Sequence, residues 1–259
     1  MSIRSSLHLH KPVKDLKALA LYFVDKIAVI VMDNGENRIN FELIVKFHKL
    51  LDIVERNSSC KGLITTADGK FYCNGLDLDW ALQHSTEQVE ELLVQLNELQ
   101  MRLLLFPMPT LAALNGHAFA GGALFAIAHD LRVLRQDKGW LCFNEVKING
   151  VFVKCHFPLM RTKIGFGHNY TDAIVLGKRY TGPEALSSGL VHAAPPISLL
   201  LIESIHLLKS FSGKSGYPRE SLQLMKSDVY RDVITQYQVD LDSNSMKKAA
   251  EKTKSMSKL

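Results

Sequence analysis

The chain has 259 residues, of which 47% are hydrophobic and 22% charged, and this balance is typical of a globular protein with one large or two small domains. The net charge of +5 is small, and the basic residues show no interleaved aromatic pattern, so we do not expect a nucleic-acid surface. No apolar run reaches the ~18 residues of a transmembrane helix, so no membrane partner is expected either.

The first half of the chain alternates strand-like and helix-like patterns. Asn40 is a predicted N-cap, Ser85 to Gln88 forms a capping box, and Pro107 ends the helix that follows this box. The predicted elements are a hairpin of strands at 18–24 and 27–32, a helix over 41–57, a strand at 62–66 and a helix from 86 to about 106.

The second half predicts a strand at 110–116, a helix starting near Gly121 and a strand at 131–135. After residue 157 the pattern is helical, with one long amphipathic stretch over 218–252. Alternating strands and helices indicate an α/β fold with largely parallel pairing. We place a core domain at 1–200 and a C-terminal helical region at 201–259, which is either a small subdomain or an oligomerisation arm.

The stretch ALNGHAFAGGALFAIAHD at 113–130 combines alanines that favour a helix with glycines that do not. One interpretation is a tight turn followed by a buried helix, in which small side chains let two backbones approach closely. The other is a helix N-terminus whose free backbone N–H groups face a ligand. The pattern alone leaves both open.

Most familiar catalytic motifs are absent from the sequence. We find no Walker A loop, no GxSxG, no GxGxxG after a strand and no HExxH. The four cysteines form no CxxC pair, so we expect reduced thiols in an intracellular compartment and no bound metal. His129, next to Asp130 at a predicted helix end, is expected to cap carbonyl groups.

Glu145 is a single acid in an apolar setting, within WLCFNEVKING. It is either in a surface turn, paired with Lys147, or walled off by Cys142, Phe143 and Val146. Apolar walls would raise its pKa toward that of a general base. Periodicity alone favours the surface position.

The chain ends in Ser257-Lys258-Leu259. A C-terminal SKL is the address that the peroxisomal import receptor reads. We therefore predict a peroxisomal protein with this receptor as a partner.

Four segments together resemble the crotonase family, also called the enoyl-CoA hydratase/isomerase superfamily. They are GLITTADGKFYCNGLDLDW, PMPTLAALNGHAFAGGALFAIAHDLRVL, FNEVKING and LGKRYTGPEALSSGLVHAA, and the resemblance as a whole runs from about residue 20 to 195. The resemblance implies a core built as a spiral of ββα units, here within 1–200, followed by the C-terminal helices. Within the family the chain most resembles peroxisomal Δ3,Δ2-enoyl-CoA isomerases.

In this family two backbone amides bind the thioester oxygen of an acyl-CoA, and by position these are the amides of Leu76 and Gly121. The resemblance implies an acyl-CoA substrate, with coenzyme A entering as part of it and no separate cofactor. The substrate-binding residues that it implies are Asn74, Gly75, Leu76, Asp77, Leu78, Asn115, Gly116 and Gly121.

Hydratases of the family use two glutamates, whereas the isomerases use one. The first position corresponds to Leu124, which cannot transfer a proton, and the second to Glu145. The resemblance thus implies that Glu145 is the single catalytic base of an isomerase that moves the double bond of 3-enoyl-CoA to trans-2-enoyl-CoA in fatty-acid β-oxidation. The alternatives are another acyl-CoA lyase, hydratase or hydrolase of the fold, or a non-catalytic acyl-CoA-binding relative.

The sequence departs from the family after Glu145, where a glycine-rich turn is usual and NGVFVKCHFPLM stands here. We expect His156 and Phe157 to enter the acyl pocket. The C-terminal helices are expected to cover this site or that of a neighbouring subunit. The resemblance also implies a homotrimer or a hexamer.

Overall fold

The computed structural model of the protein describes residues 3, 11–212 and 215–256. A six-stranded sheet in the order β1-β2-β3-β4-β6-β8 forms its centre. The first three strands pair antiparallel and the pairs from β3 to β8 are parallel, which confirms the predicted hairpin and the predicted parallel pairing. The strands are β1 (Lys14–Asp15), β2 (Leu19–Val24), β3 (Ile27–Met32), β4 (Gly62–Ala67), β6 (Thr110–Leu114) and β8 (Leu131–Leu134).

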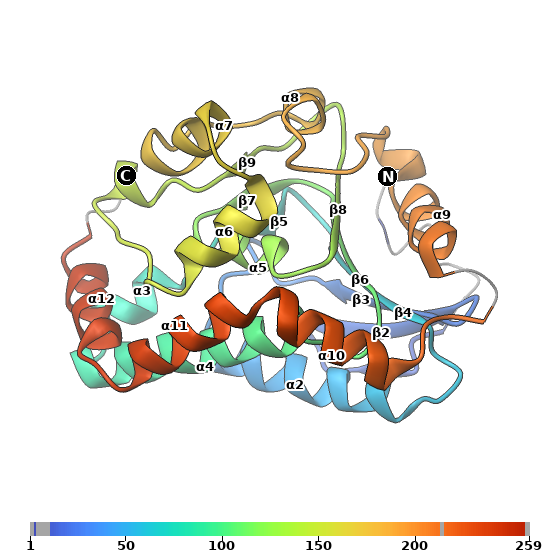
Figure 1. The fold of residues 1–259 in the computed structure, drawn as a ribbon, viewed down its shortest axis with the longest axis horizontal. Coiled ribbons are helices and arrows are strands. Elements are labelled where there is room, and N and C mark those ends of the chain that lie inside the picture. Colours follow the sequence, from blue (N-terminus) through green and yellow to red (C-terminus); the bar gives the residue numbers. More distant parts are fainter. Residues whose placement is uncertain (1–2, 4–10, 213–214, 257–259) are drawn as a thin grey trace.

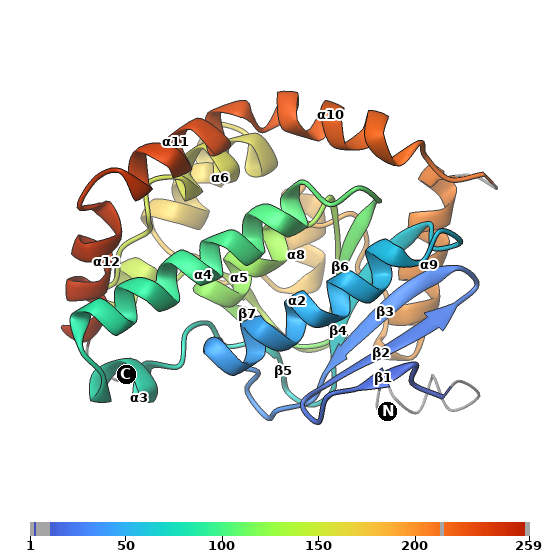
Figure 2. The ribbon, with the colours of Figure 1, turned by 90° about the horizontal axis from the view of Figure 1, so that it is seen from below.

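Helices cover both faces of this sheet, so strands β3 and β4 are buried at every position. Helices α2 (Phe41–Arg56) and α4 (Thr86–Leu104) run side by side over one face, and α9 (Leu200–Ser212) packs against the other (Figure 2). A Cβ atom at Gly62 would lie 2.5 Å from Cδ2 of Leu208, which shows how closely α9 approaches β4.

The predicted helix starts are confirmed at the level of single hydrogen bonds. The side chain of Asn40 accepts from the amide of Leu43 at 3.0 Å. Ser85 and Gln88 form the reciprocal capping box. Side-chain caps are local features, and for that reason the sequence reveals them.

A second, three-stranded parallel sheet stands beside the first and gives the core its repeating pattern. It consists of β5 (Phe71–Cys73), β7 (His117–Phe119) and β9 (Leu141–Cys142). In each of the pairs β4-β5 and β6-β7, the first strand belongs to the six-stranded sheet and the second to the three-stranded sheet. Helices follow each pair: α3 (Leu78–Gln83) and α4 follow the first, and α5 (Gly121–Ile127) follows the second. These are the ββα units expected from the resemblance.

The remainder of the chain is helical. Its elements are η1 (Glu145–Ile148), α6 (His156–Ile164), α7 (His168–Tyr170), η2 (Thr171–Val175), α8 (Gly182–Ser187), η3 (Ile197–Leu199), α10 (Arg219–Val229), α11 (Arg231–Leu241) and α12 (Ser245–Lys254). No helix in the described part of the chain is long and apolar enough to cross a membrane.

The single amphipathic stretch predicted over 218–252 is wrong as one helix, because three helices occupy it. The breaks fall at Tyr230 and between Asp242 and Asn244. They let the chain bend around the core, so that α10, α11 and α12 form an arc that ends against α4 and α3 (Figure 2). The division of the chain at residue 200 stays a prediction.

Candidate active site

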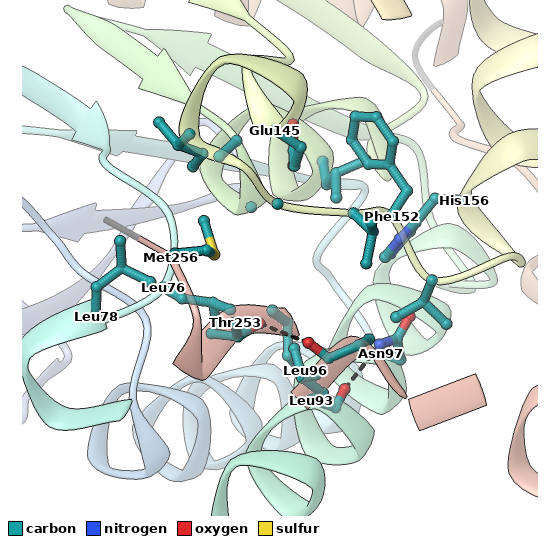
Figure 3. A pocket seen from close by; sticks show the side chains of 18 of the residues that line it. Leu76, Leu78, Leu93, Leu96, Asn97, Glu145, Phe152, His156, Thr253 and Met256 are labelled. Carbon is teal, nitrogen blue, oxygen red and sulfur yellow. Dashed lines mark hydrogen bonds between the residues drawn. The ribbon is translucent and has the colours of Figure 1, made fainter. Parts of the chain in front are cut away.

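A cavity of about 80 Å³ lies where five parts of the chain meet. Its walls come from the loop after β5, the start of α5, the segment 145–156, and helices α4 and α12. Figure 3 shows Glu145 and Phe152 on one side of the cavity, with Leu93, Leu96 and Thr253 on the opposite side. Helix α12 therefore covers the cavity of its own chain, which is one of the two arrangements expected from the sequence.

The loop after β5 turns the Leu76 amide toward α5. Ile39 pairs with the residues on either side of Leu76, through Ile39 N to Gly75 O at 2.8 Å and Asp77 N to Ile39 O at 3.0 Å. Since successive residues of an extended chain point their amides to opposite sides, the Leu76 N–H faces away from Ile39. Gly75 makes the turn with a φ of +78°.

The amide of Gly121 lies next to that of Leu76. A Cβ atom at Gly121 would lie 3.6 Å from the Leu76 nitrogen, and a Cβ atom at Gly75 would lie 3.2 Å from the Gly121 nitrogen. Both residues line the cavity, and neither amide donates a hydrogen bond to another of the described residues. The geometry thus brings together two free N–H donors at one side of the cavity.

The two adjacent glycines at the start of α5 differ in what an added side chain would contact. A Cβ atom at Gly121 would make only ordinary contacts, the nearest at 3.5 Å from Gly75 Cα, and would point toward the loop after β5. A Cβ atom at Gly122 would come within 2.1 Å of the Cys73 carbonyl oxygen. Gly122 is therefore required for packing of α5 against β5, as the first interpretation expects, whereas a ligand at the free Gly121 amide stays a prediction.

Glu145 is buried, which overturns the surface-turn interpretation. The residue is 7% exposed, and its Oε2 atom has no hydrogen-bond partner among the described residues. Burial raises the pKa of its carboxyl group to about 8, because the charged form loses its hydration. Phe143 and Cys142 are buried beside it as expected, but Val146 is 54% exposed and forms no wall.

Backbone hydrogen bonds hold the turn that carries Glu145. Its carbonyl accepts from the amide of Gly150 at 2.7 Å, and Asn149 closes the turn in the left-handed conformation. Glu145 is the one carboxylate among the described residues that line the cavity, and Leu124 lines the same cavity. The acid therefore faces the cavity without an ion-pair partner.

The other predicted binding residues divide into two groups. Asn74 and Leu78 line the cavity, and the Asn74 amide donates to Glu36 Oε2 at 3.0 Å. Gly75 and Asp77 do not line the cavity but shape the loop. Gly75 makes its turn, and Asp77 caps α3 by accepting from the Trp80 amide at 3.2 Å.

Asn115 and Gly116 were expected to bind substrate, and the structure places them away from the cavity. The Asn115 side chain donates to the Gly69 carbonyl at 3.0 Å, and a Cβ atom at Gly116 would lie 2.1 Å from the Lys70 carbonyl oxygen. The reason is local packing, because these two residues hold the β6–β7 connection against the turn before β5.

Of three further polar residues that line the cavity, the sequence predicted only one. His156 lines the cavity as expected, whereas Phe157 does not and packs edge-on against Phe152 at 5.8 Å. Asn97 and Thr253 were missed. Asn97 could have been noticed as a polar residue within the apolar stripe of α4, but nothing in the sequence brings α12 to this place.

No group of three or more His, Cys, Asp or Glu side chains that could hold a metal ion occurs in residues 3, 11–212 and 215–256. The four cysteines are free and buried. His129 makes the expected carbonyl contact, with its Nδ1 3.0 Å from the Phe125 carbonyl oxygen.

Comparison with known proteins agrees with this architecture. The family model described as Enoyl-CoA hydratase/isomerase matches residues 23–258. The chain is 35% identical over 178 residues to the Enoyl-CoA delta isomerase 2, peroxisomal, of Arabidopsis thaliana, covering 66% of this chain and 73% of that protein. It is 32% identical over 230 residues to Enoyl-CoA delta isomerase 3 of the same plant, covering 86% and 94%.

Among solved structures, the human mitochondrial delta3-delta2-enoyl-CoA isomerase superimposes with a TM-score of 0.75 at 21% identity, covering 91% of this chain and 96% of that one. At this identity the likeness concerns the fold alone. The crotonase fold expected from the sequence is thereby confirmed.

Proposed function

Because the chain belongs to the enoyl-CoA hydratase/isomerase family, whose chemistry is on enoyl-CoA, we propose that it moves the double bond of 3-enoyl-CoA to give trans-2-enoyl-CoA in fatty-acid β-oxidation. The observation that carries this proposal is Glu145, a single buried carboxylate on the cavity that has no ion-pair partner and whose Oε2 atom is unpaired among the described residues. Leu124 lines the cavity at the position where the hydratases of the family have a second acid.

In the proposed reaction the ionised Glu145 removes a proton from C2 of the substrate. The electron pair of the C2–H bond forms the C2=C3 double bond by way of an enolate, and the former C3=C4 pair takes up the same proton from Glu145 at C4. One base is enough, since the proton that leaves C2 returns at C4. A pKa of about 8 suits such a base, which must both accept and release a proton near neutral pH.

Negative charge develops on the thioester oxygen when the C2 proton leaves. In the proposal the amides of Leu76 and Gly121 bind this oxygen, which requires two free donors side by side. A donor of this kind contributes about 2.7–4 kcal/mol to the stability of the transition state. The apolar lining from Leu78, Leu93 and Leu96 would exclude water from the enolate.

Hydration of 2-enoyl-CoA is the alternative, because it is the other activity named in the family. It needs one group to activate water and another to deliver a proton. His156 is the second titratable lining residue, but burial lowers its pKa to about 4, so its ring is neutral near pH 7 and is a poor proton donor.

A side-by-side spectrophotometric assay of 3-enoyl-CoA and 2-enoyl-CoA tests the proposal. We expect turnover of 3-enoyl-CoA to the conjugated product and hydration of 2-enoyl-CoA that is slower by about 10²-fold or more, the contribution of one acid–base group. Faster hydration than isomerisation would favour the hydratase. Tight binding of both substrates with no turnover would favour a non-catalytic relative.

We also propose import into peroxisomes through Ser257-Lys258-Leu259, which lie outside the described residues. The peroxisomal description of one Arabidopsis relative supports this location. Deletion of the three residues from a protein with an N-terminal fluorescent tag should leave it outside peroxisomes with its activity unchanged. Continued import of the truncated protein would refute the proposal.

A homotrimer or a hexamer is the assembly that we propose. Helix α10 exposes Leu224, Met225 and Val229, each more than half accessible to solvent, and an oligomer would bury such a face. Light scattering at micromolar concentrations should give a mass of about three or six chains. The mass of one chain would contradict this assembly.

A further inference from the structure

The turn that carries Glu145 is tied to the last turn of α12. Lys252 Nζ donates to Asn149 Oδ1 at 2.6 Å. Among the described residues this is the one side-chain hydrogen bond that joins the segment 145–153 to another helix. A bond from a charged donor is stronger than one between neutral groups, so this contact can restrain the turn.

Asn149 is the residue through which this contact reaches Glu145. It closes the turn in the left-handed conformation, with a φ of +57°, and its amide donates to the Glu145 carbonyl. The amide of Gly150 donates to the same carbonyl at 2.7 Å. The side chain of Asn149 is therefore bonded to α12 while its backbone is bonded to Glu145.

A second contact supports the same turn from within the cavity. A Cβ atom at Gly150 would lie 3.0 Å from Met256 Cε and 3.5 Å from Glu145 Cβ. Met256, which follows the end of α12, thus packs against the turn close to Glu145. Figure 3 shows Thr253 and Met256 across the cavity from Glu145.

Helix α12 is itself fixed to the part of the chain that carries the Leu76 amide. It packs against α4 and α3, and Lys254 Nζ donates to the carbonyl of His84, the C-cap residue of α3. Helix α3 begins at Leu78, directly after the loop that contains Leu76. The last turn of α12 therefore connects the turn of Glu145 with the helix that follows this loop.

We propose that Lys252 is a positioning residue, which acts through Asn149 to hold Glu145 in place relative to the amides of Leu76 and Gly121. The inference rests on the proposed function, because it takes Glu145 as the base. A base must lie within hydrogen-bond reach of the proton that it removes, and a displacement of about 1 Å can lower a rate by about 10²-fold. The segment NGVFVK, which stands where the family usually has a glycine-rich turn, supplies Asn149 for this contact.

The test removes the two sides of the contact in turn. Lys252→Met deletes the donor, and Asn149→Gly deletes the acceptor while glycine still adopts the left-handed conformation. We expect each variant to lower kcat on 3-enoyl-CoA by about tenfold and to keep KM within about twofold, since the residues that line the cavity remain. The double variant should lose no more than either single variant, because both changes delete the same contact.

Lys252→Arg and Asn149→Asp keep a donor and an acceptor, so each should retain most of the wild-type rate. Lys248→Met removes the same charge at an exposed position of α12 and is the matched control, expected to keep the wild-type rate. Circular dichroism checks that each variant is folded. Additive losses in the double variant, or an equal loss in the control, would overturn the proposal. A raised KM with unchanged kcat would overturn it as well, since Lys252 would then bind the substrate itself.

Hydrogen exchange separates this inference from the proposed function, because it needs no substrate. The amides of Asn149 and Gly150 should exchange several-fold faster in Lys252→Met than in the wild type or in Lys248→Met, since a less restrained turn opens more often. Faster exchange together with no isomerisation by the wild type would keep the contact and refute the isomerase. Unchanged exchange and an unchanged rate in Lys252→Met would keep the isomerase and overturn the positioning role.

Discussion

The two ends of the short helix α5 differ in whether their polar groups have hydrogen-bond partners. At its start, Ala120 occupies the cap position with a φ of +49° and no side chain caps the helix. The amide of Gly121 is free there, near the free amide of Leu76, and it lies on the same cavity as Glu145, whose Oε2 atom has no partner among the described residues.

At the other end of α5, polar groups are paired several times over. His129 contacts the Phe125 carbonyl through Nδ1 and Thr65 Oγ1 through Nε2. Asp130 Oδ2 accepts from the Thr110 amide at 2.8 Å and from Lys226 Nζ at 2.6 Å.

Lys226 donates also to the carbonyls of Phe106 and Met108, so the ends of α4, α5 and α10 are tied together. The two regions lie at opposite ends of one helix. The polar groups of one region pair within the fold, whereas the other leaves the Gly121 amide and the Glu145 Oε2 atom without a partner among the described residues. Charge removal should therefore have opposite consequences at the two ends.

The largest expected effect is on the rate at the unpaired end. Glu145→Gln keeps the shape of the side chain but cannot accept a proton, and one residue serves both proton transfers of the proposed reaction. We expect isomerisation to fall by about 10⁴-fold, the upper end of acid–base contributions, with acyl-CoA binding within a few-fold of wild type. Steady-state rates and calorimetry measure the two quantities.

Glu251→Gln on α12 is the matched control, since Glu251 is exposed, and it should leave the rate unchanged. A Glu145→Gln enzyme within tenfold of wild type would mean that another residue is the base. Asp77 and His156 would then be the residues to test.

At the paired end the expected effect is on stability. Asp130→Asn leaves the Lys226 ammonium group buried without its counter-ion, and removing one partner of a buried pair costs about 3–5 kcal/mol of unfolding free energy. Denaturant unfolding measures this loss. Asp137→Asn breaks a surface pair with Arg135 and should cost less than about 1 kcal/mol. Equal losses in the two variants would contradict the assigned role of Asp130.

Charge removal at Glu145 should stabilise the fold, and the effect depends on pH. The pKa of Glu145 is about 8 in the folded protein, against 4.5 for an unperturbed glutamate. A raised folded pKa means that the protonated carboxyl stabilises the fold below pH 4.5. This contribution is lost as pH rises toward 8, since the unfolded chain ionises first.

Above pH 8 the wild type should therefore be less stable than Glu145→Gln, by on the order of 4 kcal/mol, given 1.36 kcal/mol per pKa unit. The difference should vanish below pH 4.5. Chemical unfolding of both proteins across this range measures it. A constant difference at every pH would mean that burial does not raise the pKa of Glu145 in solution.

The smallest effect concerns the adjacent glycines. Gly122→Ala puts a methyl group against the Cys73 carbonyl, and the backbone must shift, at a cost of about 1–3 kcal/mol of stability. Gly121→Ala makes only ordinary contacts and should change stability by less than about 1 kcal/mol, since alanine suits a helix better. Thermal unfolding compares the two, and a reversed order would contradict this division between packing and cavity.

Local features of this molecule were predictable from the sequence. The caps at Asn40 and Ser85 depend on neighbouring residues alone, and so does the hairpin split by Asp25-Lys26. The breaks in the stretch 218–252 could not be predicted from the sequence, because the apolar stripe continues through Tyr230. In the structure one helix ends and the next begins at this residue. The curvature of the core decides where such a helix must bend.

The candidate site was predictable only in part, since its walls come from segments far apart in the chain. Leu76, Gly121 and Glu145 followed from the family resemblance, whereas periodicity placed Glu145 at the surface. Gly122 and Asn115 share motifs with residues of the cavity but pack against backbone, which only tertiary contacts reveal. Thr253 belongs to the cavity because the arc of C-terminal helices returns to α4.

That arc has a consequence for the order in which the site is completed during folding. The parallel strand pairs and the contacts between α12 and α4 join parts of the chain that are distant in sequence, and contacts of this kind form slowly. Residues 245–254 emerge from the ribosome about a hundred residues after Glu145, so the core sheets can form while the cavity is still open. In a nascent chain the cavity would therefore lack the wall that Ala249 and Thr253 supply, and this wall would be added only when α12 docks.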